Sequence, residues 1–182
     1  STLVLNVTNK CNLSCTYCYE YGEDRITEPL GKDGKPRSPR MSIETARESI
    51  DFLFEKSAGR PAVTITFFGG ETLLNFEVVR EATIYASARA QETGQHISFS
   101  LTTNATLLDT AVIDFLVEHR FGINVSIDGA GEDHDSHRTF KSGKGSYDLI
   151  VPHIKELLTK NRAAGGRPIG ARVTLTAGRS SV

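Results

Sequence analysis

The three cysteines of this 182-residue chain lie in one short stretch, Cys11-Asn-Leu-Ser-Cys15-Thr-Tyr-Cys18. Thiolates are the usual ligands of iron–sulfur clusters, and three of them on one loop can hold three irons of a 4Fe–4S cluster. The fourth iron then has no protein ligand and is free to bind a substrate or cofactor. The spacing therefore predicts an iron–sulfur site that takes part in chemistry.

Two other interpretations of these cysteines are open. A structural zinc site is usually closed by four ligands, often in two pairs, and all five histidines lie far downstream, from His96 onward. A non-catalytic module that binds zinc with a distant fourth ligand is therefore an alternative. The cysteines are also small enough to cluster by chance as buried apolar residues, but such clustering is uncommon.

The Cys-x3-Cys-x2-Cys loop resembles the signature of the radical S-adenosylmethionine (radical SAM) enzymes. The resemblance implies two cofactors, a 4Fe–4S cluster and S-adenosylmethionine, whose amino and carboxylate groups chelate the open iron. In this family an electron from the cluster splits the sulfonium bond and releases a 5′-deoxyadenosyl radical. That radical abstracts a hydrogen atom from the substrate.

Composition limits the classes of partner. Lys and Arg number 21 against 22 Asp and Glu, a net charge of −1, which gives no electrostatic reason to expect nucleic acid or an anionic membrane as partner. No apolar run approaches the roughly 20 residues of a membrane span. An odd number of closely spaced cysteines suits a reducing compartment, so we expect a cytoplasmic protein. Both ends fall beside strand-like runs, so we expect the chain to be part of a longer protein.

Short β-branched runs alternate with amphipathic stretches along the chain. The predicted strands are residues 3–7, 63–68, 97–103, 123–127 and 169–176, and the predicted helices are residues 43–57, 76–93, 110–119 and 147–163. Expected helix caps are Ser42, Asn75, Asp109, Ser146 and, at a C-terminus, Gly94. Pro152 should kink the last helix or mark a later start. This alternation predicts an α/β fold with a parallel sheet, and five units fit most of a six-stranded partial barrel. The resemblance implies that this is a partial (β/α)6 radical SAM barrel with about five of its strands over residues 1–182.

The predicted strands are polar on one face. Buried parallel strands normally read as continuous apolar runs, but here Ser100 and Thr102 alternate with apolar residues, as do Asn124 and Ser126. A face that is simply wet would explain this pattern. The better account is a curved sheet with helices on its apolar face and a polar ligand on the other, bound where the strands end.

The loops at the strand ends hold the remaining candidates. Gly69-Gly70-Glu71 resembles the family motif that binds the amino group of S-adenosylmethionine, with glycines that allow close approach and a carboxylate that can accept from an ammonium group. The resemblance also implies that Thr102, Asn104 and Ser126 contact the ribose and carboxylate, and that Tyr17 packs near the adenine and the backbone of Glu20 reads its amino group. Arg172 either pairs with the cofactor carboxylate or makes a structural ion pair.

A further motif, Asp128-Gly129 followed by His134-Asp135-x-x-Arg138, resembles the subgroup that modifies peptides and proteins. It includes the anaerobic sulfatase-maturating enzymes and the maturation protein of quinohemoprotein amine dehydrogenase. The resemblance implies a peptide or protein substrate, a reductant such as flavodoxin or ferredoxin, and a SPASM or twitch extension beyond Val182 with auxiliary clusters. A radical SAM enzyme for a small-molecule precursor is the alternative.

Residues 22–40 are rich in glycine, proline and charge, which predicts a flexible loop. We expect it to cover the mouth of the barrel or to guide a peptide substrate; the alternative is a solvated surface insertion. No general acid or base is evident, and hydrogen abstraction needs none.

Overall fold

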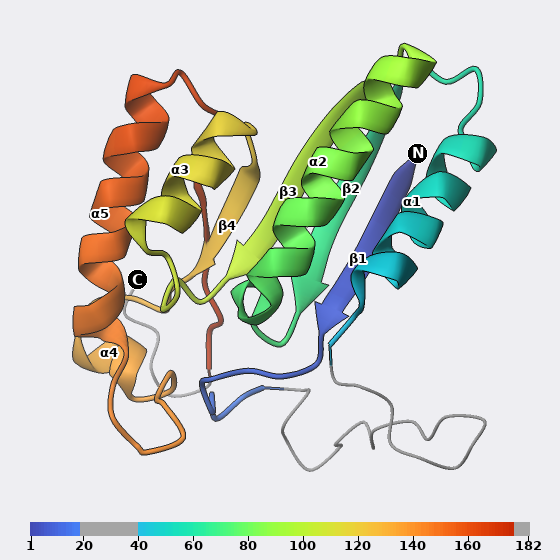
Figure 1. The fold of residues 1–182 in the computed structure, drawn as a ribbon. Helices are drawn as coiled ribbons and strands as arrows, with labels where there is room; N and C mark the ends of the chain where they lie inside the picture. Colours follow the sequence, from blue (N-terminus) through green and yellow to red (C-terminus); the bar gives the residue numbers. More distant parts are fainter. Residues whose placement is uncertain (19–39, 177–182) are drawn as a thin grey trace, which may run out of the picture.

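Five parallel strands form one sheet in the order β1-β2-β3-β4-β5, with helices packed along it (Figure 1). The structure is a computed structural model that describes residues 1–18 and 40–176. The strands are β1 (Thr2–Thr8), β2 (Ala62–Gly69), β3 (His96–Thr103), β4 (Gly122–Ser126) and β5 (Gly170–Arg172). The helices are α1 (Ile43–Lys56), η1 (Thr72–Asn75, a 3₁₀ turn), α2 (Phe76–Thr93), α3 (Thr110–Glu118), α4 (Glu132–Asp135) and α5 (Tyr147–Ala163). The predicted α/β fold, a partial barrel with five parallel strands, is thus confirmed.

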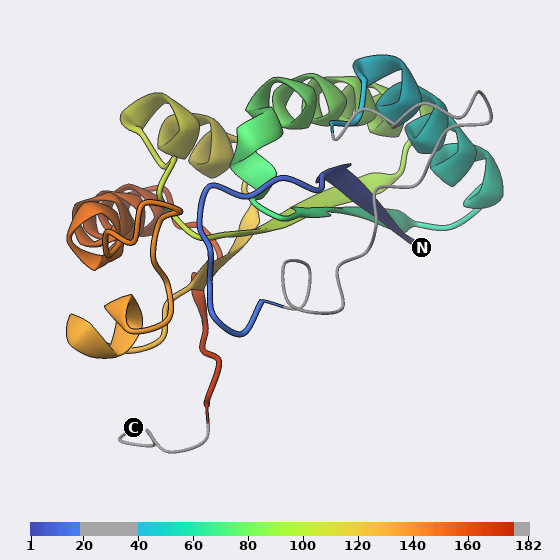
Figure 2. The ribbon, with the colours of Figure 1, turned by 90° about the horizontal axis from the view of Figure 1, so that it is seen from below.

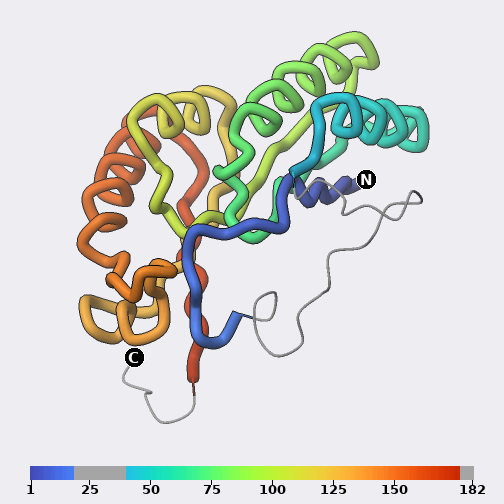
Figure 3. Tube along the Cα trace, turned by 60° about the horizontal axis from the view of Figure 1, so that its bottom comes forward, coloured from blue at the N-terminus to red at the C-terminus, as the bar shows by residue number. Residues whose placement is uncertain are grey.

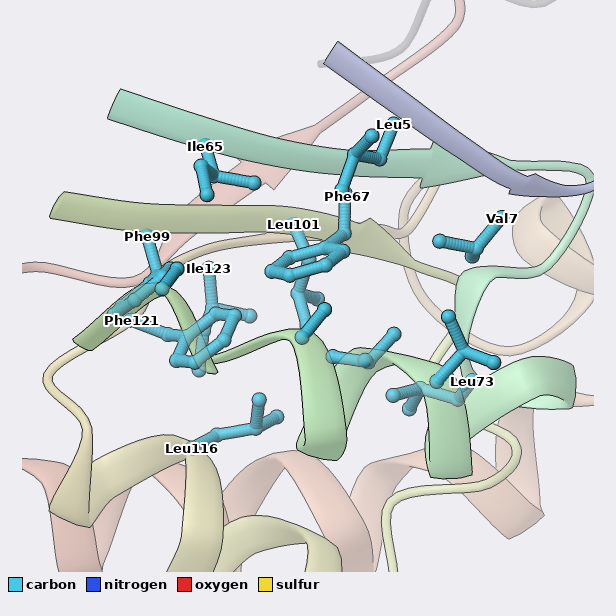
Figure 4. Packing of buried hydrophobic residues seen from close by; sticks show 14 of the residues in the cluster. Leu5, Val7, Ile65, Phe67, Leu73, Phe99, Leu101, Leu116, Phe121 and Ile123 are labelled. Atoms are coloured by element: carbon cyan, nitrogen blue, oxygen red, sulfur yellow. The ribbon is translucent and has the colours of Figure 1, made fainter. Parts of the chain in front are cut away.

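Helices α1, α2 and α3 gather on one side of the sheet (Figure 2). The core lies between these layers, because every second strand residue faces the helices. Phe67 of β2, Phe99 of β3 and nearby Phe121 stack there, with ring centroids 5.3–6.4 Å apart (Figure 4). The apolar faces that the strand patterns predict are therefore buried against the helices.

The other face of the sheet is polar over much of its area. Thr66 of β2 and Ser100 of β3 are register partners, and their hydroxyl oxygens lie 2.9 Å apart. Two large apolar residues interrupt the pattern, Val4, which is 59% exposed, and Phe68 near the end of β2. The polar face is real, but it is less uniform than the strand sequences predict.

The fifth strand is shorter than predicted, and residues 173–176 continue without regular structure. The reason is the length of its neighbour: β4 ends at Ser126, the register partner of Arg172, so no ladder is available beyond that point. Side chains bind the following residues instead. The backbone N–H of Thr174 donates to Asp128, and the hydroxyl of Thr176 lies 3.0 Å from His137 Nε2.

Some of the predicted helix caps are present in the structure. Ser42 and Asp109 accept hydrogen bonds from the backbone as N-caps, and Gly94 ends α2 in a left-handed conformation, as predicted. Asn75 makes no cap bond, because its side-chain amide donates to the backbone oxygens of Val7 and Met41.

The N-terminal cap of α5 also differs from the prediction. Ser146 stands at the N-cap position, but its hydroxyl donates to the backbone oxygen of Arg138 and makes no cap bond. The helix begins at Tyr147 and continues through Pro152, so a later start was wrong. No helix among the described residues has the length and apolarity needed to cross a membrane.

Candidate functional site

The cysteine loop follows β1 and passes the carboxyl ends of the strands, beside the chain that follows β5 (Figure 3). A short segment after α4 holds it in place: the N–H groups of Ser14 and Thr16 donate to the backbone oxygens of Thr139 and His137, at 2.8 and 3.0 Å. Leu13 is buried and forms an isolated bridge with Phe140. The loop therefore depends on residues more than a hundred positions away.

A cavity of about 420 Å³ opens at these strand ends. The three cysteines line it together with most of the predicted cofactor contacts. Its lining includes Cys11, Cys15, Cys18, Tyr17, Gly69, Gly70, Glu71, Thr102, Asn104, Ser126 and Arg172. Glu20 and nearly all of the loop over residues 22–40 lie outside the described residues. The fold thus brings every described candidate to one place.

Glu71 lies at this cavity, but the residue is only 1% exposed, and its carboxylate is held by the protein. It accepts hydrogen bonds from the Thr103 hydroxyl and the Asn104 N–H, both at 2.7 Å, and from the Leu73 N–H at 3.0 Å. Burial raises the pKa of this carboxyl, and the three hydrogen bonds act in the opposite direction. Through these hydrogen bonds the carboxylate connects the segment that follows β2 to the end of β3.

Asn104 connects the end of β3 to the cysteine loop. Its Nδ2 donates to Asn12 Oδ1 at 2.9 Å and reaches Cys11 Sγ at 3.8 Å. Its Oδ1 accepts from the backbone N–H and the hydroxyl of Thr106, so the amide has one orientation. The side chain predicted to contact cofactor therefore also supports a predicted cluster ligand.

Asp128 and Arg138 form a buried ion pair in the cavity wall, with Nε of Arg138 2.8 Å from Oδ2 and side chains 3% and 8% exposed. The Tyr17 hydroxyl also donates to Asp128, and Nη1 of Arg138 lies 3.9 Å from Cys15 Sγ. Burial alone would raise the pKa of Asp128, but its hydrogen bonds and Arg138 outweigh it and lower the pKa. Sequence reasoning noted both residues in a motif and gave neither a role.

The other members of that motif anchor the surrounding chain. His134 is buried, with Nε2 3.0 Å from the Ser146 hydroxyl and Nδ1 accepting from the Asp128 N–H at 3.4 Å. Asp135 accepts from the N–H groups of Ser146 and Tyr147, at 2.8 and 2.9 Å. The motif thus fastens the end of β4 to the start of α5, and this connection places Arg138 in the cavity.

The donor set fits a thiolate-bound cluster better than a single ion. Among residues 1–18 and 40–176 there is no group of three or more His, Cys, Asp or Glu placed to hold one metal ion. In a cubane cluster each thiolate takes a different iron, so the sulfurs need not converge on one point. Burial raises the pKa of Cys11 to about 11 and also raises that of Cys15, so these thiols need a metal to become thiolates near neutral pH.

Several curated proteins resemble this chain over most of its length. A serine-type anaerobic sulfatase-maturating enzyme of Bacteroides thetaiotaomicron is 32% identical over 151 residues, 81% of this chain and 34% of that protein. A cysteine-type enzyme of Clostridium novyi is 28% identical over 160 residues, 86% of this chain and 40% of that protein. An Fe-coproporphyrin III synthase of Methanosarcina barkeri is 32% identical over 174 residues, 95% of this chain and 36% of that protein. The chain spans less than half the length of these relatives.

Solved structures share the fold. The structure of native anSMEcpe with bound AdoMet matches with a TM-score of 0.73 and 23% identity, covering 94% of this chain and 43% of that one. The same protein with bound AdoMet and Cp18Cys peptide matches with a TM-score of 0.72 and 20% identity, covering 93% and 41%.

The model of the Radical SAM superfamily matches residues 5–168, which include all three cysteines and nearly all of the described cavity. This match agrees with the cysteine loop, the parallel sheet and the place of the cavity at the strand ends. The chain belongs to the radical SAM superfamily, a family whose cofactors are a 4Fe–4S cluster and S-adenosylmethionine.

Proposed function

We propose that this chain is the catalytic core of a radical SAM enzyme that modifies a peptide or protein. The observation that carries the proposal is that one cavity gathers three cysteines with the residues predicted to bind S-adenosylmethionine. When bound, the cluster and S-adenosylmethionine supply a 5′-deoxyadenosyl radical, which removes one hydrogen atom from the substrate.

The chain's own residues then have distinct tasks. Cys11, Cys15 and Cys18 hold three irons. The glycines that end β2 let the backbone approach the cofactor, and Ser126 and Arg172 offer a hydroxyl and a cation to its ribose and carboxylate. Tyr17 presents an aromatic ring to the adenine. Together these contacts bind and orient the cofactor, which is most of what a protein contributes to radical chemistry of this kind.

The peptide substrate is supported by the relatives rather than by the cavity alone. Both sulfatase-maturating relatives act on a protein by name, and a solved neighbour has a peptide bound beside AdoMet. We further propose cytoplasmic location, a flavodoxin- or ferredoxin-type reductant, and a SPASM or twitch extension after Val182. The greater length of the relatives supports such an extension. A crosslink such as a thioether is the product class we favour.

A small-molecule substrate is the second candidate. Its support is the Fe-coproporphyrin III synthase of Methanosarcina barkeri, which aligns over 95% of this chain at 32% identity. That degree of likeness is similar to the one with the sulfatase-maturating enzymes, so the core by itself does not favour peptides strongly.

The test is made on the full-length protein, reconstituted anaerobically with iron and sulfide. With dithionite and S-adenosylmethionine it should form methionine and 5′-deoxyadenosine, measured by liquid chromatography and mass spectrometry. The Cys15→Ala variant should form neither, whereas Ser14→Ala, a change on the same loop, should retain the reaction. Cleavage of S-adenosylmethionine by Cys15→Ala, or stoichiometric zinc without cluster absorption, would contradict the proposal.

The two substrate classes are separated by a second measurement. The enzyme is incubated with a deuterated proteome digest from its host or with a deuterated small-molecule extract of the same host, and deuterium is followed into 5′-deoxyadenosine. Deuterium from the peptides supports the first candidate, and deuterium from the small-molecule extract supports the second.

A further inference from the structure

Arg138 is a buried cation whose position is fixed on three sides. Its Nε donates to Asp128 Oδ2 at 2.8 Å, its guanidinium carbon lies 5.5 Å from the centroid of the Tyr17 ring, and its Nη1 reaches Cys15 Sγ at 3.9 Å. The side chain is 8% exposed, so water screens its charge weakly. The guanidinium therefore has one orientation, with an N–H directed at a cysteine sulfur.

The partners of Arg138 are themselves held. Asp128 accepts from the Thr174 N–H at 2.9 Å and from the Tyr17 hydroxyl, and the backbone oxygen of Arg138 accepts from Ser146 Oγ at 2.7 Å. If Arg138 served only to neutralise Asp128, its guanidinium would need no contact with the Tyr17 ring or with Cys15 Sγ. The ion pair is neutral as a whole, but its cationic end is the end that contacts Cys15.

We infer that Arg138 is a positioning residue that raises the reduction potential of the cluster bound by Cys15. The inference rests on the proposed function, because it requires that Cys15 ligate iron. A cluster that gains one electron gains one negative charge, spread in part over its thiolate sulfurs. A cation and an N–H donor at one sulfur stabilise that reduced state more than the oxidised state, and this contact makes reduction easier.

The consequence concerns the electron that starts the reaction. A low-potential one-electron donor must reduce the cluster before S-adenosylmethionine is cleaved, and one electron passes from donor to cluster. Without Arg138 the same donor would reduce a smaller fraction of the enzyme. Arg138 thereby adjusts the cluster to the donor without touching the substrate.

The test is a redox titration of the full-length, reconstituted protein, followed by electron paramagnetic resonance. The relevant cluster is the one whose reduced signal changes when S-adenosylmethionine is added, which separates it from any auxiliary cluster. We expect Arg138→Gln to make its reduction about tenfold less favourable, equivalent to ~59 mV for one electron. Arg138→Lys keeps the charge but loses the planar guanidinium, so its reduction potential should lie between those of the wild type and Arg138→Gln.

Two further variants separate the effect of the contact with Cys15 from that of an unpaired carboxylate and from that of general charge. Arg138→Gln combined with Asp128→Asn leaves a neutral, hydrogen-bonded pair in place of an unpaired buried carboxylate, and it should show the same lowered potential. Arg172→Gln removes a cation from the same cavity lining and should shift the potential less. An equal shift in Arg172→Gln would show that general charge, rather than the contact with Cys15, sets the potential.

The failures are distinguishable. If the wild-type protein binds no cluster that responds to S-adenosylmethionine, the proposed function fails. If that cluster is present and its potential is the same in wild type, Arg138→Gln and the double variant, only the role of Arg138 is overturned. Loss of iron from all the Arg138 variants with native circular dichroism would also overturn it, because Arg138 would then retain the cluster rather than tune it.

Discussion

The carboxylate of Glu71 accepts a 2.7 Å hydrogen bond from the backbone N–H of Asn104, the residue that follows β3. Glu71 itself follows β2, so this bond joins two neighbouring strand ends. The Thr103 hydroxyl donates to the other carboxylate oxygen at 2.7 Å. The two loops that carry most of the predicted cofactor contacts are therefore held at a fixed separation by one buried side chain.

Replacing Glu71 with glutamine should destabilise the protein. A glutamine amide places N–H donors where the carboxylate has acceptors, so at least one of the three donors around it loses its partner. We expect the free energy of unfolding to fall by about 2 kcal/mol, as for a buried hydrogen bond to a charged group. Urea denaturation measures this loss. Glu48→Gln on the exposed side of α1 should change stability by less than about 0.5 kcal/mol, and equal losses in the two variants would contradict the argument.

Alanine at Gly69 should disturb the strand ends more than alanine at another glycine with positive φ. Gly69 has φ 154°, and a Cβ there would lie 2.3 Å from the backbone oxygen of Thr8. Gly94 has φ 69° and open space around its Cβ position, so Gly94→Ala shows the cost of the backbone conformation alone, about 1–2 kcal/mol. Thermal unfolding of both variants should give the lower melting temperature for Gly69→Ala. Similar melting temperatures would mean that the Thr8 carbonyl moves freely.

Local patterns were enough to predict most of the fold. Alternating strand residues such as Phe99 and Leu101 predict a buried face, and the spacing between strands leaves room for one helix each, so the parallel sheet follows. The end of β5 was beyond this reasoning, because it is set by where β4 stops. The role of Asn75 was also hidden, since its backbone partners Val7 and Met41 lie far away in the sequence.

The candidate site was likewise predictable from the sequence only in part. The cysteines and Gly69 lie on short motifs that follow strands, and their meeting at the strand ends is a consequence of the parallel topology. The contact of Arg138 with Cys15 spans more than a hundred residues and depends on how His134 and Asp135 fasten α5. A motif shows that such residues belong together, but only the folded chain shows which sulfur the guanidinium meets.

Removal of the Asn104 side chain should loosen the cluster. The amide supports the cysteine loop through Asn12 Oδ1 at 2.9 Å and Cys11 Sγ at 3.8 Å. Loss of an outer hydrogen-bond partner of a metal ligand typically costs 10–100-fold in affinity, so Asn104→Ala should lose iron to a chelator at least about tenfold faster. Asn124→Ala, on the exposed face of β4, is the matched control. Equal rates of iron loss in the two variants would show that Asn104 does not support the loop.

His134 should make the protein less stable as the pH falls. Burial, and after it the charge of Arg138, lowers the pKa of His134 below its ordinary value, about 6.5. The unfolded chain therefore takes up a proton near pH 6.5 while the folded chain resists it, so stability present above that pH is lost as the pH falls through the folded pKa. The difference in unfolding free energy between wild type and His134→Gln should shrink from pH 7.5 to 5. Ser146→Ala removes a partner but keeps the imidazole, so its pH dependence should match the wild type; a pH-independent difference for His134→Gln would show that this histidine is not held neutral.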